Sequence, residues 1–158
     1  KEGYPVEKFA NRLKLFSNKY GVDIYLEPGE TAITSSAELV TKVVDIVHNN
    51  IDIAIVDAST EAHMLDLLIY RTAAKMDNEG GRYRYMVAGR SCLAGDVFGV
   101  YNFRRKLKIG DTIKIADAAG YSMVKKNWFN GLQMPSIVVK KLWTNRSCKK
   151  IFIRRLFI

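Results

Sequence analysis

Apolar residues recur every three or four positions along the first twenty residues of the chain. This spacing predicts an amphipathic helix over residues 5–20, opened by Pro5 and ended by Gly21. The apolar face of this helix comprises Val6, Phe9, Leu13, Phe16 and Tyr20. The β-branched run that follows predicts a strand over residues 22–26. The chain therefore opens with one helix and one strand.

A different pattern, alternation of apolar and polar residues, begins at Ala37. It predicts a β-hairpin over residues 37–57 that turns at Asn49-Asn50. We expect its two apolar faces to be formed by Val40, Val44 and Ile46, and by Ile51, Ile53 and Ile55. Further strands are expected at 82–88, 97–101, 112–117 and 121–126, with a turn at Gly110-Asp111. Short strands at this spacing are typical of a compact β-domain.

The formal net charge of +9 is concentrated at the end of the chain. Residues 140–158 carry seven lysines and arginines and no acid, which leaves a formal charge of +2 on the remaining residues. We expect this basic tail to be solvated or disordered. Because no RNA-binding signature with interleaved aromatic residues occurs elsewhere, nucleic acid is not an expected partner.

The two cysteines, Cys92 and Cys148, permit at most one disulfide and no metal cluster, so we expect no metal and a cytoplasmic location. No apolar run is long enough to span a bilayer and no signal peptide opens the chain, so no membrane partner is expected. We interpret a chain of 158 residues that starts without methionine as a piece of a longer protein.

Three segments carry candidate chemistry: Leu26–Glu30, Gly89–Asp96, and Ala119–Tyr121 followed by Trp128–Gly131. In the first, a glycine permits close approach of the backbone to a phosphate, and a carboxylate can keep a heteroaromatic nitrogen protonated. Taken alone, such a segment is more often an ordinary turn after a strand. Together the three resemble the C-terminal part of pyridoxal-phosphate decarboxylases of the alanine-racemase-like type, and within them the carboxynorspermidine decarboxylase family.

The resemblance implies an α/β barrel remnant followed by a mainly-β C-terminal domain. Residues 1–30 would be the last helix and strand of a (β/α)8 barrel that binds pyridoxal phosphate. Residues 31–140 would be the C-terminal β-domain, and residues 141–158 an atypical basic tail.

The resemblance also assigns residues to the cofactor, pyridoxal 5'-phosphate. Glu27 would face the pyridine nitrogen, Gly29 would lend its N–H to the phosphate, and Tyr121 would contact the phosphate as well. The protonated ring then acts as an electron sink for decarboxylation. In this family the Schiff-base lysine lies upstream of residue 1, so no lysine of this chain is given that role.

Four residues would bind the amines of a polyamine substrate. Glu30 stands where the ornithine and diaminopimelate decarboxylases have arginine, and an acid there suits a cationic amine. Asp96 would bind an amino group, while Asp66 and His63 belong to a stretch of the family form D-A-S-x-x-x-H-M-x-D. The alternatives without a role in binding are that Glu30 is a solvated surface acid and that His63 is a structural side chain.

Cys92 would help to return a proton to the decarboxylated carbon, as a thiol of suitable pKa can. In the family that this chain resembles, the loop enters the active site of the neighbouring subunit, and the resemblance therefore implies a homodimer. The implied reaction is decarboxylation of carboxynorspermidine or carboxyspermidine. Two alternatives stay open: an ornithine- or diaminopimelate-type decarboxylase of the same fold, and a non-catalytic or degenerate decarboxylase-like protein.

Overall fold

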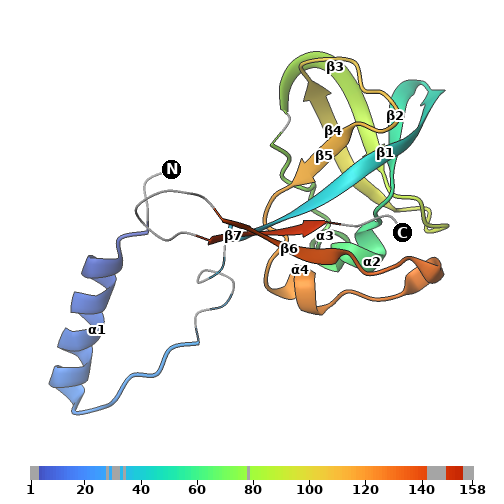
Figure 1. Ribbon diagram of the computed structural model, residues 1–158. Helices are drawn as coiled ribbons and strands as arrows, with labels where there is room; N and C mark the ends of the chain where they lie inside the picture. Colours follow the sequence, from blue (N-terminus) through green and yellow to red (C-terminus); the bar gives the residue numbers. More distant parts are fainter. Residues whose placement is uncertain are drawn as a thin grey trace.

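The computed structural model describes residues 4–27, 29, 33, 35–77, 79–141 and 149–154, and of residues 140, 141 and 149–154 it describes only the backbone. Within this part of the chain, strands in the order β4-β3-β2-β1-β7-β6 form one mixed sheet, and β5 pairs with β1 (Figure 1). The strands are β1 (Ala37–Asn49), β2 (Ile51–Val56), β3 (Glu79–Ala88), β4 (Val97–Phe103), β5 (Thr112–Ile115), β6 (Ser136–Lys141) and β7 (Lys149–Arg154).

The long strand β1 organises this sheet. Its first residues pair with β5 and with β7, and its last residues pair antiparallel with β2. Asn50 makes the turn between β1 and β2 with a φ of 59°, in the left-handed region that asparagine tolerates. The predicted hairpin and its turn are therefore confirmed.

The buried face of the hairpin differs from the predicted one, except at Ile46, which is partly buried and packs against the core. The buried positions are Ala37, Glu38, Leu39, Thr41 and Val43 on β1, and Ala54 and Val56 on β2. Paired apolar residues such as Leu39-Val40 and Val43-Val44 make the alternation ambiguous, because either member can face the core. A register shift between Val43 and Asp45 also changes which residues share a face beyond that point.

Aromatic residues from β3 and β4 fill the core beneath the sheet. Tyr85 packs edge-on against Phe103, with ring centroids 5.9 Å apart, and Phe98 is fully buried. The hydroxyl of Tyr101 lies 2.7 Å from Ala74 O and 2.6 Å from Phe98 O. Burial raises the pKa of Tyr101 above its usual value, so this hydroxyl keeps its proton.

Helix α1 (Val6–Tyr20) confirms the predicted helix, and Gly21 ends it in the left-handed conformation with a φ of 63°. No residue of α1 is buried, and Figure 1 shows the helix standing apart from the sheet. The strand predicted at 22–26 is wrong, because this stretch is extended chain without a strand assignment and Tyr25 is 90% exposed. A β-strand requires hydrogen bonds to a neighbouring strand, and the described residues provide none here.

Short helices gather at one end of the sheet, as Figure 1 shows: α2 (Thr60–His63), α3 (Leu65–Tyr70) and α4 (Tyr121–Val124). The predicted strand at 121–126 is wrong because α4 occupies it. Gly120 turns the chain with a φ of 58°, and its carbonyl accepts hydrogen bonds from the N–H groups of Met123 and Val124. A helical turn thereby replaces the strand, and a 3-10 turn at Phe129–Gly131 follows it.

The basic tail also differs from expectation over part of its length. Residues 149–154 form β7, which pairs parallel with β1 and antiparallel with β6. The run of three bulky apolar residues, Ile151, Phe152 and Ile153, is compatible with a strand. The expectation of a solvated or disordered end is therefore wrong for residues 149–154.

Candidate functional site

The loop between β3 and β4 carries Cys92 at the protein surface. Cys92 is an exposed, free thiol. Its backbone N–H donates a hydrogen bond to Oδ1 of Asn130, at 2.8 Å, from the 3-10 turn that follows α4. Two segments that are far apart in the sequence therefore meet at this cysteine. The thiol itself is accessible to a reactant.

Asp96 anchors the other end of the same loop, and it is only 4% exposed. Its Oδ1 accepts hydrogen bonds from the N–H and the hydroxyl of Thr60, at 2.7 and 2.8 Å. Its Oδ2 accepts from the N–H and the hydroxyl of Ser91, at 3.1 and 2.6 Å. A carboxylate has about four lone-pair sites, so these bonds leave none for a ligand. The predicted contact between Asp96 and a substrate amine does not fit this placement.

His63 is buried in α2, with 2% exposure. Its Nδ1 accepts the N–H of Ser59 at 3.0 Å, and its Nε2 lies 3.1 Å from the carbonyl of Gln133. We assign the ring proton to Nε2, because Nδ1 faces a donor and Nε2 faces an acceptor. The ring ties α2 to the segment before β6, and it does not present a nitrogen to a substrate.

Asp66 and Tyr121 come together across α3 and α4. The Asp66 carboxylate pairs with the ammonium of Lys125 at 2.7 Å, and that ammonium lies 4.5 Å from the centre of the Tyr121 ring. The hydrogen bond to Asp66 raises the pKa of Lys125. Tyr121 is 53% exposed, so its ring is accessible to a ligand. This cluster joins one predicted substrate residue to one predicted cofactor residue.

The neighbouring Lys126 behaves in the opposite way. Burial lowers the pKa of this lysine to about 8, because the charged form loses contact with water. Two adjacent lysines thus have pKa values shifted in opposite directions.

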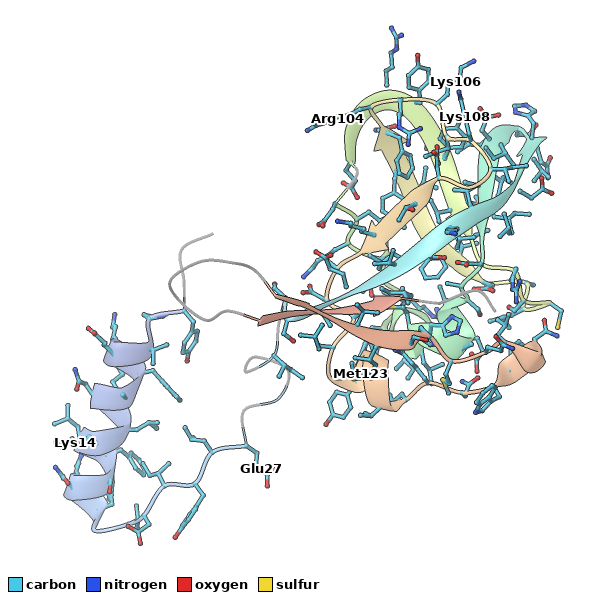
Figure 2. All side chains as sticks on the ribbon, viewed as in Figure 1. Lys14, Glu27, Arg104, Lys106, Lys108 and Met123 are labelled. Carbon is cyan, nitrogen blue, oxygen red and sulfur yellow. The ribbon has the colours of Figure 1, made fainter. Side chains whose placement is uncertain are left out.

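The remaining predicted residues lie away from these clusters. Glu27 and Gly29 belong to the exposed segment after α1, and Glu30 falls outside the described residues. In Figure 2, Glu27 is far from Met123, which marks the position of α4. The structure thus connects Cys92 and Asp96 through one loop, but it does not bring Glu27 or Gly29 to either cluster.

The sequence did not predict individual roles for three residues that organise the site, namely Thr60, Ser91 and Asn130. Ser91 and Asn130 do lie within the candidate segments Gly89–Asp96 and Trp128–Gly131. Asn130 has a φ of 60°, and asparagine directly before glycine is a known signal for such left-handed positions. Thr60 and Ser91 had no comparable signal, because their roles depend on contacts 36 and five positions away.

A pocket of about 320 Å³ lies elsewhere, between the ends of β3, β4 and β5. Its lining contains none of the predicted site residues; it consists of Asp77, Phe103, Arg104, Arg105, Leu107 and Thr112. In the part of the chain that the structure describes, no group of three or more metal-ligating side chains occurs. Among the same residues, no helix is long and apolar enough to cross a membrane.

Comparison with known proteins identifies the class. Residues 23–119 match the family described as pyridoxal-dependent decarboxylase, C-terminal sheet domain. The chain therefore belongs to this family, and its mixed sheet is the C-terminal sheet domain of the fold. The predicted mainly-β C-terminal domain is confirmed.

Within this decarboxylase family, the chain is similar to two enzymes of the same name. The chain is 52% identical over 139 residues to a carboxynorspermidine/carboxyspermidine decarboxylase of Herminiimonas arsenicoxydans, covering 88% of this chain and 38% of the relative. It is 44% identical over 154 residues to the Campylobacter jejuni enzyme of the same name, covering 88% and 40%. The chain thus spans about two fifths of the length of these relatives.

A solved structure agrees with these relatives. The crystal structure of carboxynorspermidine decarboxylase from Campylobacter jejuni, complexed with norspermidine, superposes with a TM-score of 0.80 at 39% identity. The alignment covers 98% of this chain and 45% of that one. The resemblance to carboxynorspermidine decarboxylases is confirmed.

The described residues do not by themselves form a site for pyridoxal phosphate. Glu27 and Gly29 are exposed, and an added Cβ at Gly29 would meet no atom within 4 Å. Tyr121 is accessible but lies on α4, near Asp66 and Lys125. The three predicted cofactor residues are therefore exposed, but they do not form a common binding site within the described residues.

Proposed function

We propose that this chain is the C-terminal part of a pyridoxal-phosphate-dependent decarboxylase that acts on carboxynorspermidine, carboxyspermidine or both. The products would be norspermidine or spermidine and carbon dioxide. The observation that carries this proposal is 52% identity over 139 residues to a relative of that name. In this proposal residues 1–30 belong to the barrel, residues 31–140 form the C-terminal domain, and residues 141–158 form a basic tail.

Within the complete enzyme, we assign Glu27, Gly29 and Tyr121 to the cofactor, and Glu30 and Asp66 to the substrate amines. An acid suits this role because the amines of the substrate keep their protons near pH 7. Asp66 already pairs with Lys125, so a substrate cation has to share or replace that partner. Asp96 and His63 would act through the loops they hold, because their polar atoms are engaged within the chain.

Cys92 is the proposed proton donor to the decarboxylated carbon. Its exposure supports this role, since the thiol remains open to a substrate that is held outside the described residues. In the complete enzyme a second subunit would bring its own cofactor to this loop, so we propose a homodimer with shared sites. The cytoplasm is the proposed compartment, because two cysteines in 158 residues are too few for a disulfide framework.

Steady-state kinetics of the complete enzyme test this function. We expect kcat/KM for carboxynorspermidine and carboxyspermidine to exceed that for ornithine and diaminopimelate by at least about a hundredfold, a typical effect of misplaced or missing charge contacts. The same assay measures which of the two triamines, carboxynorspermidine or carboxyspermidine, has the higher kcat/KM. Turnover of ornithine alone would support the ornithine-type alternative, and turnover of none would support a non-catalytic relative.

A further inference from the structure

The loop that carries Cys92 is held at two points by side chains from other segments. The N–H of Cys92 donates to Oδ1 of Asn130 at 2.8 Å. One residue earlier, both the N–H and the hydroxyl of Ser91 donate to the carboxylate of Asp96. The backbone on either side of the Ser91-Cys92 peptide bond is therefore fixed, while the thiol is left exposed.

These two attachments lead to the same short helix. Asp96 accepts from the N–H and the hydroxyl of Thr60 in α2. The segment before Asn130 reaches α2 as well, because the N–H of Asn127 donates to the carbonyl of Ala62 at 3.1 Å. The buried helix α2 thus connects both supports of the cysteine loop.

The conformation of Asn130 adds an independent observation. Its φ of 60° and ψ of 21° lie in the left-handed region, which costs most residues free energy and which asparagine and glycine tolerate best. Strain of this kind persists where surrounding contacts fix it, and it is frequent at functional sites. At this position the left-handed backbone allows the side chain to meet the N–H of Cys92.

We propose that Asn130 and Asp96 are positioning residues that together fix the Cys92 backbone for proton return to the product carbon. This inference rests on the proposed role of Cys92. It assigns neither residue a contact with substrate. Asn130 sets the direction of the Cys92 peptide group, and Asp96 fixes the preceding residue against α2.

Substitutions at residue 130 separate the hydrogen bond from the backbone strain. Asn130→Gly keeps the left-handed conformation without penalty but removes the acceptor, whereas Asn130→Asp keeps both the tolerance and the acceptor. Asn50→Gly is the matched control, because Asn50 has a φ of 59° but lies in the exposed turn between β1 and β2.

In the complete enzyme, we expect Asn130→Gly to speed amide hydrogen exchange at Cys92 by about fivefold or more, the loss of one hydrogen bond. Its kcat should fall about tenfold with KM nearly unchanged, since misplacement of a reacting group slows the chemical step. Asn130→Asp should restore both values to within about twofold. Asn50→Gly should match the parent in both.

Two outcomes would overturn the proposal, and they can be told apart by Cys92→Ala. If Cys92→Ala lowers kcat but Asn130→Gly changes neither kcat nor exchange at Cys92, the positioning role of Asn130 is wrong and the function of Cys92 stands. If Cys92→Ala leaves kcat unchanged, the proposed role of Cys92 fails and the positioning role in catalysis fails with it.

Discussion

Gly89 packs directly against the carboxylate of Asp96, so that a Cβ added at residue 89 would overlap the carboxylate atoms. The N–H of Gly89 also donates to the carbonyl of Asp96 at 2.8 Å. The two ends of the cysteine loop are thereby closed on one another. This contact explains why the loop needs glycine at its start, since Asp96 is fixed by its own hydrogen bonds and cannot move aside.

Gly89→Ala should therefore destabilise the protein, whereas Gly95→Ala should not. An added Cβ at Gly89 forces the buried carboxylate to shift, and overpacking of this kind costs about 1–3 kcal/mol. An added Cβ at Gly95, in the same loop, meets no atom within 4 Å. Urea unfolding of the two variants measures the difference. Equal midpoints would show that the loop can adjust around Asp96.

Asp96→Ala is expected to lower the free energy of unfolding by about 3 kcal/mol, because it leaves the buried donors of Thr60 and the partly buried donors of Ser91 without an acceptor. Asp52→Ala is the control: the Asp52 side chain is 49% exposed and pairs with His48, so its loss should cost less than about 1 kcal/mol. Chemical denaturation compares the two. A small effect at Asp96 with a large rise in KM would restore it as a substrate ligand.

Lys126 and Lys125 should react differently with an amine-acylating reagent as the pH changes. Burial lowers the pKa of Lys126 to about 8, while the bond to Asp66 raises that of Lys125. Competitive labelling followed by mass spectrometry should give Lys126 a midpoint near pH 8 and leave Lys125 largely unlabelled there. Identical pH profiles at the two lysines would contradict the burial of Lys126.

The same shift at Lys126 affects stability. The folded protein binds fewer protons than the unfolded chain between about pH 8 and the ordinary lysine pKa of 10.5, so stability from this group increases as the pH rises through that range. Lys126→Met should remove this increase and stabilise the protein most below pH 8. Thermal unfolding of the parent and the variant at pH 7 and pH 9.5 measures this pH dependence. If the variant has the same pH dependence of stability as the parent, the pKa of Lys126 is not lowered.

Asp66→Asn in the complete enzyme should raise KM for the triamine substrate by about tenfold, with a smaller change in kcat. The amide keeps the shape but loses the charge that attracts an ammonium group. Asp52→Asn removes an equal charge from the far end of the hairpin and should leave KM unchanged. Equal KM values in the two variants would exclude Asp66 from the substrate site.

Much of the fold could be predicted from the sequence, because helix α1 and the hairpin β1–β2 are signalled locally. The apolar spacing from Val6 to Tyr20 and the turn at Asn49-Asn50 depend on neighbours only a few residues away. The strands expected at 22–26 and at 121–126 are absent for two different reasons. One has no partner strand among the described residues, and the other is turned into a helix by Gly120.

The candidate site was predictable only in part. The motifs around Cys92 and Tyr121 pointed to the family, which the comparisons confirm. The role of Asp96 was not predictable, because its partners Thr60 and Ser91 come from the fold, and a carboxylate in a loop has the same appearance in sequence whether it binds a ligand or a hydroxyl. His63 shows the same difficulty, since its burial follows from contacts with Ser59 and Gln133.

We propose that this sheet domain contributes side chains to the active site of a polyamine decarboxylase. A crystal structure of the complete enzyme with pyridoxal phosphate and norspermidine tests it most directly. We predict that the Cys92 thiol and the Asp66 carboxylate line the cavity that holds the product, with Asp96 still bound to Thr60 and Ser91. A structure in which neither Cys92 nor Asp66 of any subunit approaches the product or the cofactor would contradict the account.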